Sequence, residues 1–309
     1  MTQAAAQSSA SAAADVIVVG AGPAGSSAAY HMATLGLDVI LLEKQELGRD
    51  KVCGDGLTPS AVRELVSMGV DTSGWQRNRG LRVIGGGHLL HFPWPEQASF
   101  PSYGMARPRA LLDRDLAEHA AAAGARLLTG VTVTGPVTSP TGRVTGVEAS
   151  PTNRVAYPGI EAPTTFTAPL VIDAGGVSAR LATALGRTKN ERRPMGVAVR
   201  AYFRSPRAKD AWMESRLELW DGKPGKSDLL PGYGWIWSVG EGLVNVGLGS
   251  VSSRASATAI DYRAVFNRWM DNVPASWGFT KENQVGGLVS AALPMAFNRK
   301  PHYADGLML

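Results

Sequence analysis

Residues 15–44 read DVIVVGAGPAGSSAAYHMATLGLDVILLEK, two apolar runs that flank a group of glycines. The apolar, β-branched run 16–19 is typical of a strand buried on both faces, as in a parallel sheet. It is followed by Gly20, Gly22 and Gly25 in the spacing G-x-G-x-x-G. These glycines allow a tight turn, a close approach of backbone to a pyrophosphate, and close packing of a helix on a strand. The stretch therefore predicts a βαβ unit that binds a dinucleotide.

The phosphates of that dinucleotide are expected at the N-terminus of the helix, where free N–H groups and the helix dipole favour negative charge. A second apolar run, 39–42, ends in Glu43, whose carboxylate can accept hydrogen bonds from a ribose hydroxyl. We predict FAD rather than NAD, because the motif opens the fold, Pro23 follows its second glycine, and the rest of the chain contains no second such unit. The cofactor contacts predicted in this unit are Gly20, Gly22, Pro23, Ala24, Gly25, Glu43 and Lys44.

The composition is that of an ordinary globular protein with a substantial core. The chain has 309 residues, of which 44% are hydrophobic and 18% charged, and its formal net charge is +5. That charge suits an anionic cofactor or a membrane headgroup surface, but no Lys/Arg run is dense enough to indicate nucleic acid. A single cysteine, Cys53, excludes an internal disulfide and predicts a reducing, cytoplasmic compartment. No apolar stretch reaches the ~20 residues of a membrane span, so any membrane contact is expected to be peripheral, at the inner face of the cell membrane.

The expected fold class is α/β (α+β), with a Rossmann-like FAD-binding domain and an antiparallel-sheet substrate domain. Residues 1–14 are Ala/Ser-rich and predicted to be a disordered tail. The FAD-binding domain is assigned to 15–74, 104–190 and 300–309, and the substrate-binding domain to 75–103 and 191–299. Helices are predicted over 60–68, 107–124 and 260–270. Strands of the second domain are predicted over 195–203, 216–220, 233–239 and 243–248.

Three segments carry a more specific signal: GAGPAG at 20–25, KVCGDGLTP at 51–59, and PGYGWIWSVGEGLVNVGLG at 231–249. Together they resemble the geranylgeranyl reductase family of FAD-dependent enzymes, most closely its actinobacterial menaquinone reductase branch. The resemblance covers nearly everything from Asp15 onward. It implies a fold like that of p-hydroxybenzoate hydroxylase, and an activity that reduces isoprenoid carbon–carbon double bonds with FAD.

The same resemblance implies site residues. Those implied to lie near the flavin ring are Cys53, Gly54, Asp55 and Gly56, and Arg107 matches a family arginine that touches FAD. Those implied to line the lipid channel are Tyr233, Trp235 and Trp237, through a motif the family writes as Y-x-W-x-F-P.

The chain departs from the family pattern at three places. Trp237 and Ser238 replace the Phe and Pro of the channel motif. Gly175 stands where the family usually has an aspartate, which leaves Asp173, with Gly176, as the predicted substitute in cofactor binding. The family also continues beyond the final strand, predicted over 306–309, with a Gly-Asp motif that contacts the flavin, so we expect this chain to be C-terminally truncated.

The chemistry of alkene reduction requires a hydride from the flavin, a proton from a positioned acid, an apolar slot and exclusion of water. Cys53 and Asp55 are the candidate catalytic residues. The alternatives are a small buried hydrophobe for Cys53 and a turn carboxylate for Asp55. The aromatic residues at 233, 235 and 237 have the period-2 spacing that places them on one face of a strand, where plain core packing is the alternative. His88 and His91 would lie on opposite faces of a strand, so no metal site is predicted.

The leading hypothesis is therefore an FAD-dependent reductase of an isoprenoid double bond, with the β-isoprene unit of menaquinone as the first choice of substrate. Geranylgeranyl groups of chlorophyll or membrane-lipid precursors are rival substrates. A flavin monooxygenase and a flavin-free, non-catalytic fragment are alternatives of other classes. The electron donor is open between NADPH, a ferredoxin and a quinol, because the sequence contains no separate NAD(P)H domain.

Overall fold

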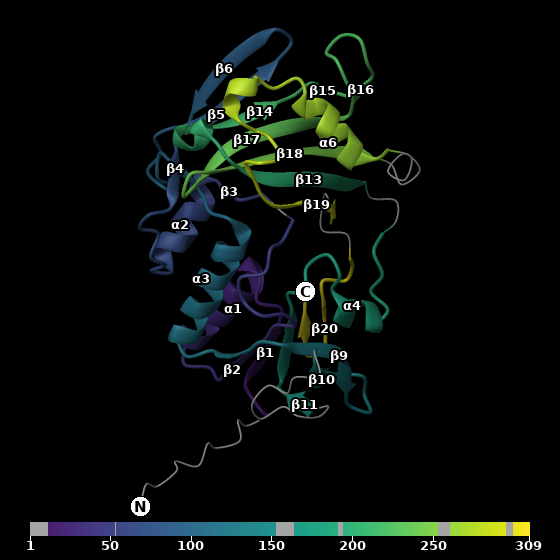
Figure 1. The fold of residues 1–309 in the computed structure, drawn as a ribbon. Helices are drawn as coiled ribbons and strands as arrows, with labels where there is room; N and C mark the ends of the chain where they lie inside the picture. The colour runs from purple at the N-terminus through teal and green to yellow at the C-terminus, as the bar shows by residue number, and fades with distance from the viewer. Residues whose placement is uncertain (1–11, 53, 153–163, 191–193, 253–259, 295–298) are drawn as a thin grey trace, which may run out of the picture. The chain divides into compact units, whose positions relative to one another are not determined.

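The computed structural model describes residues 12–52, 54–152, 164–190, 194–252, 260–294 and 299–309 (Figure 1). It divides the chain into two compact units, each made of segments distant in sequence. The first unit comprises Met1–Arg49, Leu112–Asn190 and Arg299–Leu309, and the second comprises Asp50–Leu111 and Glu191–Asn298. The predicted mixed α/β class is confirmed.

The first unit is built on a six-stranded sheet in the order β20–β21–β12–β1–β2–β8. Its strands are β1 (Val16–Val19), β2 (Val39–Leu42), β8 (Arg126–Leu128), β12 (Leu170–Asp173), β20 (Tyr303–Ala304) and β21 (Leu307–Met308). β1 pairs in parallel with β2 on one side and β12 on the other, as a buried βαβ unit requires. Its helices are α1 (Pro23–Thr34), α4 (Arg180–Ala184) and most of α3 (Arg109–Ala122).

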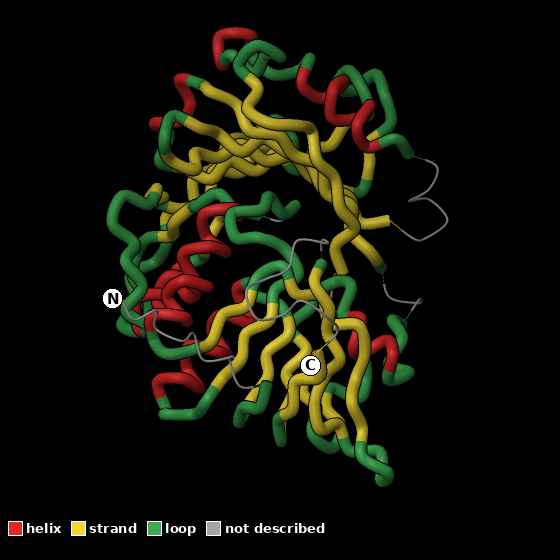
Figure 2. Tube along the Cα trace, turned by 60° about the horizontal axis from the view of Figure 1, so that its bottom comes forward, coloured by secondary structure: helices red, strands yellow, loops and turns green. Residues whose placement is uncertain are grey.

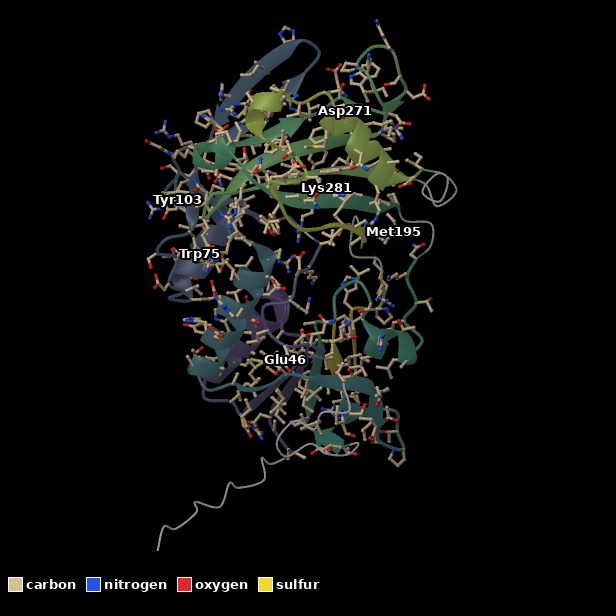
Figure 3. All side chains as sticks on the ribbon, viewed as in Figure 1. Glu46, Trp75, Tyr103, Met195, Asp271 and Lys281 are labelled. Atoms are coloured by element: carbon tan, nitrogen blue, oxygen red, sulfur yellow. The ribbon has the colours of Figure 1, made fainter. Side chains whose placement is uncertain are left out.

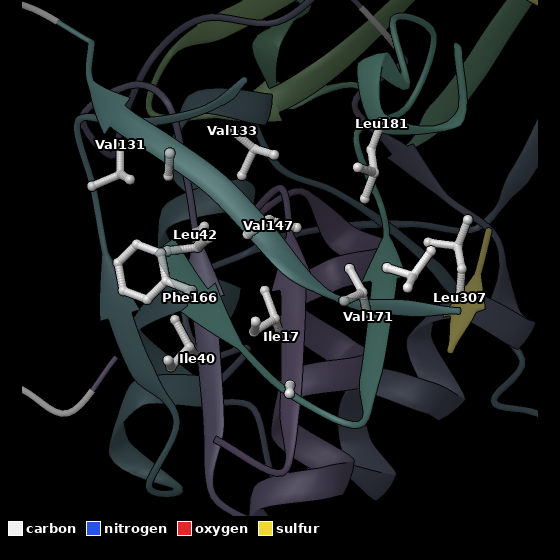
Figure 4. Packing of buried hydrophobic residues seen from close by; sticks show 13 residues of the cluster. Ile17, Ile40, Leu42, Val131, Val133, Val147, Phe166, Val171, Leu181 and Leu307 are labelled. Carbon is white, nitrogen blue, oxygen red and sulfur yellow. The ribbon is translucent and has the colours of Figure 1, made fainter. Parts of the chain in front are cut away.

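Alternate residues of the central strands serve two different cores. One face packs Val16 and Val18 against small residues of the helices α1 and α3, including Ala29 and Ala117. The other face packs Ile17, Ile40, Leu42 and Val171 against a three-stranded antiparallel sheet (Figure 4). That sheet consists of β9 (Val131–Thr138), β10 (Val144–Pro151) and β11 (Thr164–Thr167). The central strands are therefore apolar throughout because both of their faces are covered.

The second unit is built on a seven-stranded sheet in the order β19–β13–β18–β17–β14–β5–β6, seen as a twisted layer in Figure 2. Its strands are β5 (Gly80–Gly85), β6 (His88–Pro93), β13 (Met195–Arg204), β14 (Trp212–Arg216), β17 (Gly232–Gly240), β18 (Leu243–Ser252) and β19 (Gln284–Pro294). The short strands are β3 (Gly56–Leu57), β4 (Gln76–Asn78), β7 (Gly104–Ala106), β15 (Leu219–Trp220) and β16 (Leu229–Leu230). The helical segments are α2 (Pro59–Ser67), η1 (Pro206–Lys209), α6 (Tyr262–Met270) and η2 (Ala275–Trp277).

One face of this sheet packs against α6, which lies across it in Figure 1. The strand residues of that core are Val199, Ala201, Phe203, Ile236, Val244, Val246 and Leu248. The helix supplies Tyr262, Val265, Phe266 and Trp269, all buried. The spacing of these four residues gives α6 the apolar stripe of an amphipathic helix.

The second unit differs from the sequence prediction in three respects. Its sheet contains one parallel pair, β5 with β14, in an otherwise antiparallel arrangement. β19 was not predicted, because Gly286 and Gly287 interrupt its strand pattern. Residues 50–74 and 104–111, assigned to the FAD-binding domain from the sequence, belong to the second unit. Strand pairing explains this difference, since β3 and β4 both pair with β7 and hold these segments together.

None of the helices in the described part of the chain has both the length and the apolar character needed to cross a membrane. Within the same residues, no group of His, Cys, Asp and Glu side chains is placed to hold a metal ion. His91 instead accepts a hydrogen bond from Arg82 Nε at 3.1 Å and packs edge-on against Trp212.

Candidate functional site

The glycine motif lies in the first unit, in the turn from β1 to α1. Gly20 has φ +101°, a conformation that side chains rarely allow. A Cβ added at Gly25 would lie 1.9 Å from the carbonyl oxygen of Gly20, so no larger residue fits there. Both positions require glycine for physical reasons, and the helix packs directly on the turn.

The N-terminus of α1 is available to an anion. Its N-cap residue is Gly22, no side chain caps the helix, and Pro23 begins it. Ala24 is exposed, and the buried Ser26 hydroxyl has no hydrogen-bond partner among the described residues. An uncapped helix start of this kind accepts a phosphate on its free N–H groups. The turn therefore fits the pyrophosphate of a dinucleotide.

Glu43 points back toward the same turn. Its carboxylate is buried, and Oε2 accepts a hydrogen bond from the backbone N–H of Ala21 at 3.0 Å. Oε1 accepts from Gln45 N–H at 3.1 Å and lies 3.4 Å from Arg49 Nε. This places a negative charge beside the glycine turn, at the position where the βαβ motif puts a ribose. Lys44, also predicted as a cofactor contact, has an exposed side chain.

Asp173 ends β12, directly beside Val19 of β1. Both of its carboxylate oxygens accept hydrogen bonds from backbone N–H groups, from Gly175 in the following turn at 3.0 Å and from Ala182 in α4 at 2.9 Å. Gly176 follows with φ +66°. The structure thus gives Asp173 a clear role in shaping the turn before α4, at the same sheet edge as the glycine motif.

The second unit contains an apolar cavity of about 180 Å³, many times the ~10–15 Å³ that a water molecule needs. The residues that line it are Val52, Gly54, Gly196, Val197, Ala198, Arg200, Gly232, Tyr233, Trp235, Trp237, Gly249, Ser250, Val251 and Leu293. All three predicted channel residues are among them. Tyr233 and Val251 are 42% and 41% exposed, so the cavity opens to solvent beside them.

Strand register explains why this face of the sheet is hollow. Arg200, Gly247 and Trp235 are direct neighbours across β13, β18 and β17, and so point to the same face. A Cβ at Gly247 would lie 2.3 Å from the Trp235 ring, so the glycine allows the indole to lie flat against β18. The Trp235 and Trp237 rings then stack with their centroids 5.8 Å apart. Glycine alternation in β18 and tryptophan alternation in β17 together form the cavity wall.

Asp55 lies behind this wall and is completely buried. Its Oδ1 accepts a hydrogen bond from Arg109 N–H, at the start of α3, at 3.0 Å. Oδ2 accepts from the Tyr202 hydroxyl at 2.9 Å and from Asn245 Nδ2 at 2.5 Å. Asn245 in turn accepts from Trp235 Nε1 at 2.8 Å. One carboxylate therefore fixes the orientation of the cavity's central indole through a single intermediate side chain.

Burial raises the pKa of Asp55 from 3.8 to about 6, although the bonds from Asn245 and Tyr202 and the charge of Arg200 oppose the shift. Its neighbour Tyr202 is partly buried and faces a carboxylate, and both effects raise the pKa of the phenol above its usual range. Tyr202 therefore stays protonated and donates to Asp55.

Arg200 is a charged side chain in the same wall, and it is only 1% exposed. Its guanidinium pairs with the Asp50 carboxylate and donates to the Lys51 carbonyl at 3.2 Å. It also lies over the Tyr202 ring, 4.2 Å from the ring centroid. The positive charge is thus held by Asp50 and Lys51, at the start of the KVCGDGLTP segment.

The remaining predicted residues fall on or near this segment. Cys53, predicted to be catalytic and to contact the cofactor, lies outside the described residues. Gly54 is exposed and lines the cavity. Arg107 donates its backbone N–H to the Asp55 carbonyl at 3.0 Å, and its guanidinium lies over the ring of Trp75, a residue labelled in Figure 3.

Sequence reasoning missed the roles of Arg200 and Tyr202 and left that of Asn245 open. Arg200 and Tyr202 sit in a strand that the sequence predicts, at alternating positions of an otherwise apolar run. A charged residue in the middle of such a run is unusual, because it must be buried with a partner. Arg200 in the apolar run 195–203 was therefore the sequence feature that could have indicated a buried, charged site.

Comparison with known proteins agrees with these features. Residues 13–258 match a family described as FAD binding domain, and this match confirms the prediction of FAD as the cofactor. The menaquinone reductase of Mycolicibacterium smegmatis is 38% identical over 286 residues, which are 91% of this chain. A digeranylgeranylglycerophospholipid reductase of Methanosphaera stadtmanae is 30% identical over 80% of the chain. These relatives confirm the resemblance to geranylgeranyl reductases.

The chain spans 65% of the length of the first of these relatives and 57% of the second. Among solved structures, a geranylgeranyl bacteriochlorophyll reductase-like protein of Thermoplasma acidophilum superimposes with a TM-score of 0.76. It is 23% identical, and the match covers 96% of this chain and 70% of that protein. A myxobacterial chondrochloren halogenase matches with a TM-score of 0.74 at 20% identity over 96% of this chain and 67% of the halogenase. At these identities the structures show a shared fold.

Proposed function

As the chain belongs to the FAD binding domain family, we propose that it takes part in the FAD-dependent reduction of an isoprenoid carbon–carbon double bond. The preferred substrate is menaquinone, with its β-isoprene unit as the reacting group. The observation that carries this proposal is the apolar cavity of the second unit, whose wall joins the aromatic strand β17 to Val52 and Gly54 of the KVCGDGLTP segment.

In this proposal, residues of the first unit bind the cofactor and residues of the second unit bind the substrate. The glycine turn, the uncapped start of α1 and Glu43 would hold the dinucleotide. Trp235 and Trp237 would bind an apolar, planar or isoprenoid group against their rings and exclude water from it. Asp55 would act as a positioning residue, since it holds Trp235 through Asn245. Bound FAD, once reduced, supplies the hydride for the alkene.

The choice of menaquinone is supported by the higher identity to a protein named menaquinone reductase than to one named for a glycerophospholipid. The cavity also suits a lipid that enters from a membrane. Its open end carries exposed apolar side chains, Tyr233 and Val251, and Leu229, which is 56% exposed, precedes β17. We propose a peripheral contact of this rim with the inner face of the cell membrane.

The proposal is tested by anaerobic turnover of the purified, FAD-loaded protein reduced with dithionite, which makes a physiological electron donor unnecessary. One arm contains menaquinone and a second arm contains a digeranylgeranylglycerophospholipid. Mass spectrometry of the menaquinone arm should show a gain of two hydrogens confined to one isoprene unit. Two hydrogens gained only by the glycerophospholipid would transfer the proposal to that substrate, and no gain in either arm would refute it.

A matched pair of variants ties the activity to the cavity. Trp235→Ala removes ~1.5–3 kcal/mol of buried aromatic contact, which corresponds to about a 10- to 100-fold loss of substrate affinity. Trp212→Ala alters the same residue type on β14, away from the cavity, and should leave affinity unchanged. Equal losses of affinity in the two variants would show that the substrate does not bind in this cavity.

A further inference from the structure

Two N–H donors of cavity-lining residues have no acceptor among the described residues. Arg200 Nε and Trp237 Nε1 are both buried, and neither has a hydrogen-bond partner within the part of the chain that the structure describes. Both residues line the cavity. A buried donor left without an acceptor costs ~1–3 kcal/mol. Such a cost is repaid when a bound molecule brings the missing acceptor.

Two other polar groups of the cavity have partners within the protein. Trp235 Nε1, in the ring stacked on Trp237, donates to Asn245 Oδ1 at 2.8 Å. The hydroxyl of Ser250, another cavity residue, donates to the Pro231 carbonyl at 2.9 Å. The two stacked indoles therefore differ: the Trp235 N–H donates to a protein acceptor, whereas the Trp237 N–H has no acceptor among the described residues. This contrast points to a ligand atom opposite Trp237.

The charge balance indicates what kind of acceptor fits. The Arg200 guanidinium already pairs with the carboxylate of Asp50 and donates to the Lys51 carbonyl. The local charge is therefore close to neutral. An anionic phosphate would have to be desolvated in an apolar cavity without an unpaired cation to balance it, which is unfavourable. A neutral carbonyl oxygen needs an N–H donor and no balancing charge.

We propose that Arg200 Nε and Trp237 Nε1 form a subsite whose N–H donors bind the carbonyl oxygens of a quinone ring, with the ring packed against the Trp235 and Trp237 indoles. The inference deepens the proposed function and rests on it, since it assigns the cavity to the head of an isoprenoid quinone. Planar aromatic rings stack favourably on indoles. The subsite would thereby distinguish a quinone from an isoprenoid alcohol or diphosphate.

The test uses 2-methyl-1,4-naphthoquinone, which has the ring and no isoprenoid chain, and 2-methylnaphthalene, which lacks the carbonyls. Trp237→Phe keeps an aromatic ring and removes the N–H, and should weaken quinone binding about tenfold while leaving methylnaphthalene binding unchanged. Trp212→Phe, the matched control, makes the same change on β14, away from the cavity, and should change neither affinity. Infrared spectra of the ¹³C-carbonyl quinone should show a carbonyl band lowered on binding to wild type and less lowered in the variant.

Equal weakening of both probes by Trp237→Phe would overturn the subsite, since it would indicate ring packing alone. A bound carbonyl band at the position found in apolar solvent would also overturn it. The outcome of the menaquinone turnover assay does not depend on the outcome of these binding measurements. Donor-dependent quinone binding without alkene reduction would support the subsite and refute the activity, whereas alkene reduction with an unshifted carbonyl band would do the reverse.

Discussion

The two faces of the β13–β18–β17 layer are made by alternate residues of the same strands and have opposite properties. On the face toward α6, Val244, Val246 and Leu248 of β18 are completely buried in a continuous core. On the other face, the alternating positions of β18 are Asn245, Gly247 and Gly249. One strand can therefore stabilise the fold with its large residues and form a cavity with its small ones.

Each face also buries one carboxylate, and the two respond to pH in opposite ways. Glu214 lies on the helix-packed face, where it is the direct neighbour of Ile236. Despite its burial, hydrogen bonds and charge from Arg207 and Arg216 lower its pKa. Asp55 is bonded by the neutral donors Tyr202, Asn245 and Arg109 N–H, and burial raises its pKa. On the packed face the charge of Glu214 is balanced by arginines, whereas behind the cavity the ionisation of Asp55 is unfavourable.

The largest expected effect is on the packed face. Glu214→Gln removes a carboxylate that pairs with Arg82, Arg207 and Arg216, although Arg82 and Arg207 keep their pairs with Asp210. Breaking a buried ion pair costs ~3–5 kcal/mol. Chemical denaturation at neutral pH should show this loss in the free energy of unfolding. Because the pKa of Glu214 is lowered in the folded state, its contribution is present above its ordinary value of 4.5 and is lost as the pH falls through the folded pKa.

The control is Asp221→Asn, which breaks an ion pair between Asp221 and Arg268. Both side chains are partly exposed, so the cost should be ~0–1 kcal/mol. A loss for Glu214→Gln no greater than for this control would contradict the view that the packed face depends on charge balance.

A second, smaller effect concerns Asp55. The protonated form is favoured in the folded state, so its contribution to stability is complete below the unfolded pKa of 3.8 and is lost as the pH rises through about 6. The shift corresponds to about 3 kcal/mol between about pH 4 and about pH 8. The difference in unfolding free energy between wild type and Asp55→Asn should therefore fall by about this amount across that range. Parallel pH profiles for the two proteins would show that Asp55 has an ordinary pKa.

The smallest expected effect on stability comes from the cavity face. In Gly247→Ala, the new Cβ would meet the Trp235 ring at 2.3 Å and the Val199 carbonyl oxygen at 2.7 Å. Such overpacking costs ~1–3 kcal/mol, and displacement of the indole should reduce affinity for a polyprenyl ligand by about tenfold. Gly249→Ala is the matched control, because its Cβ meets Trp235 only at an ordinary 3.4 Å. If both variants bound ligand equally, the flat seating of Trp235 would be unimportant.

The sequence predicted the first unit well because its evidence is local. The glycines, the flanking apolar runs and Glu43 all fall within one βαβ unit. The Asp55 network could not be predicted, since Tyr202 and Asn245 are 147 and 190 residues away in the chain. Only the pairing of β13 with β18 brings them together. The spacing of Tyr233, Trp235 and Trp237 correctly indicated a shared face but could not indicate whether that face was packed or hollow.

Photolabelling can show directly whether an isoprenoid quinone occupies the cavity. The probe is a menaquinone analogue that carries a diazirine on an isoprene unit near the ring, applied to the FAD-loaded protein. Peptide mapping should place the label on the cavity face, at Tyr233, Trp235 or Trp237 of β17 or at Val251 of β18, and excess menaquinone should suppress it. Label confined to α6 or to β14, or label that menaquinone does not suppress, would contradict the assignment of this cavity to an isoprenoid substrate.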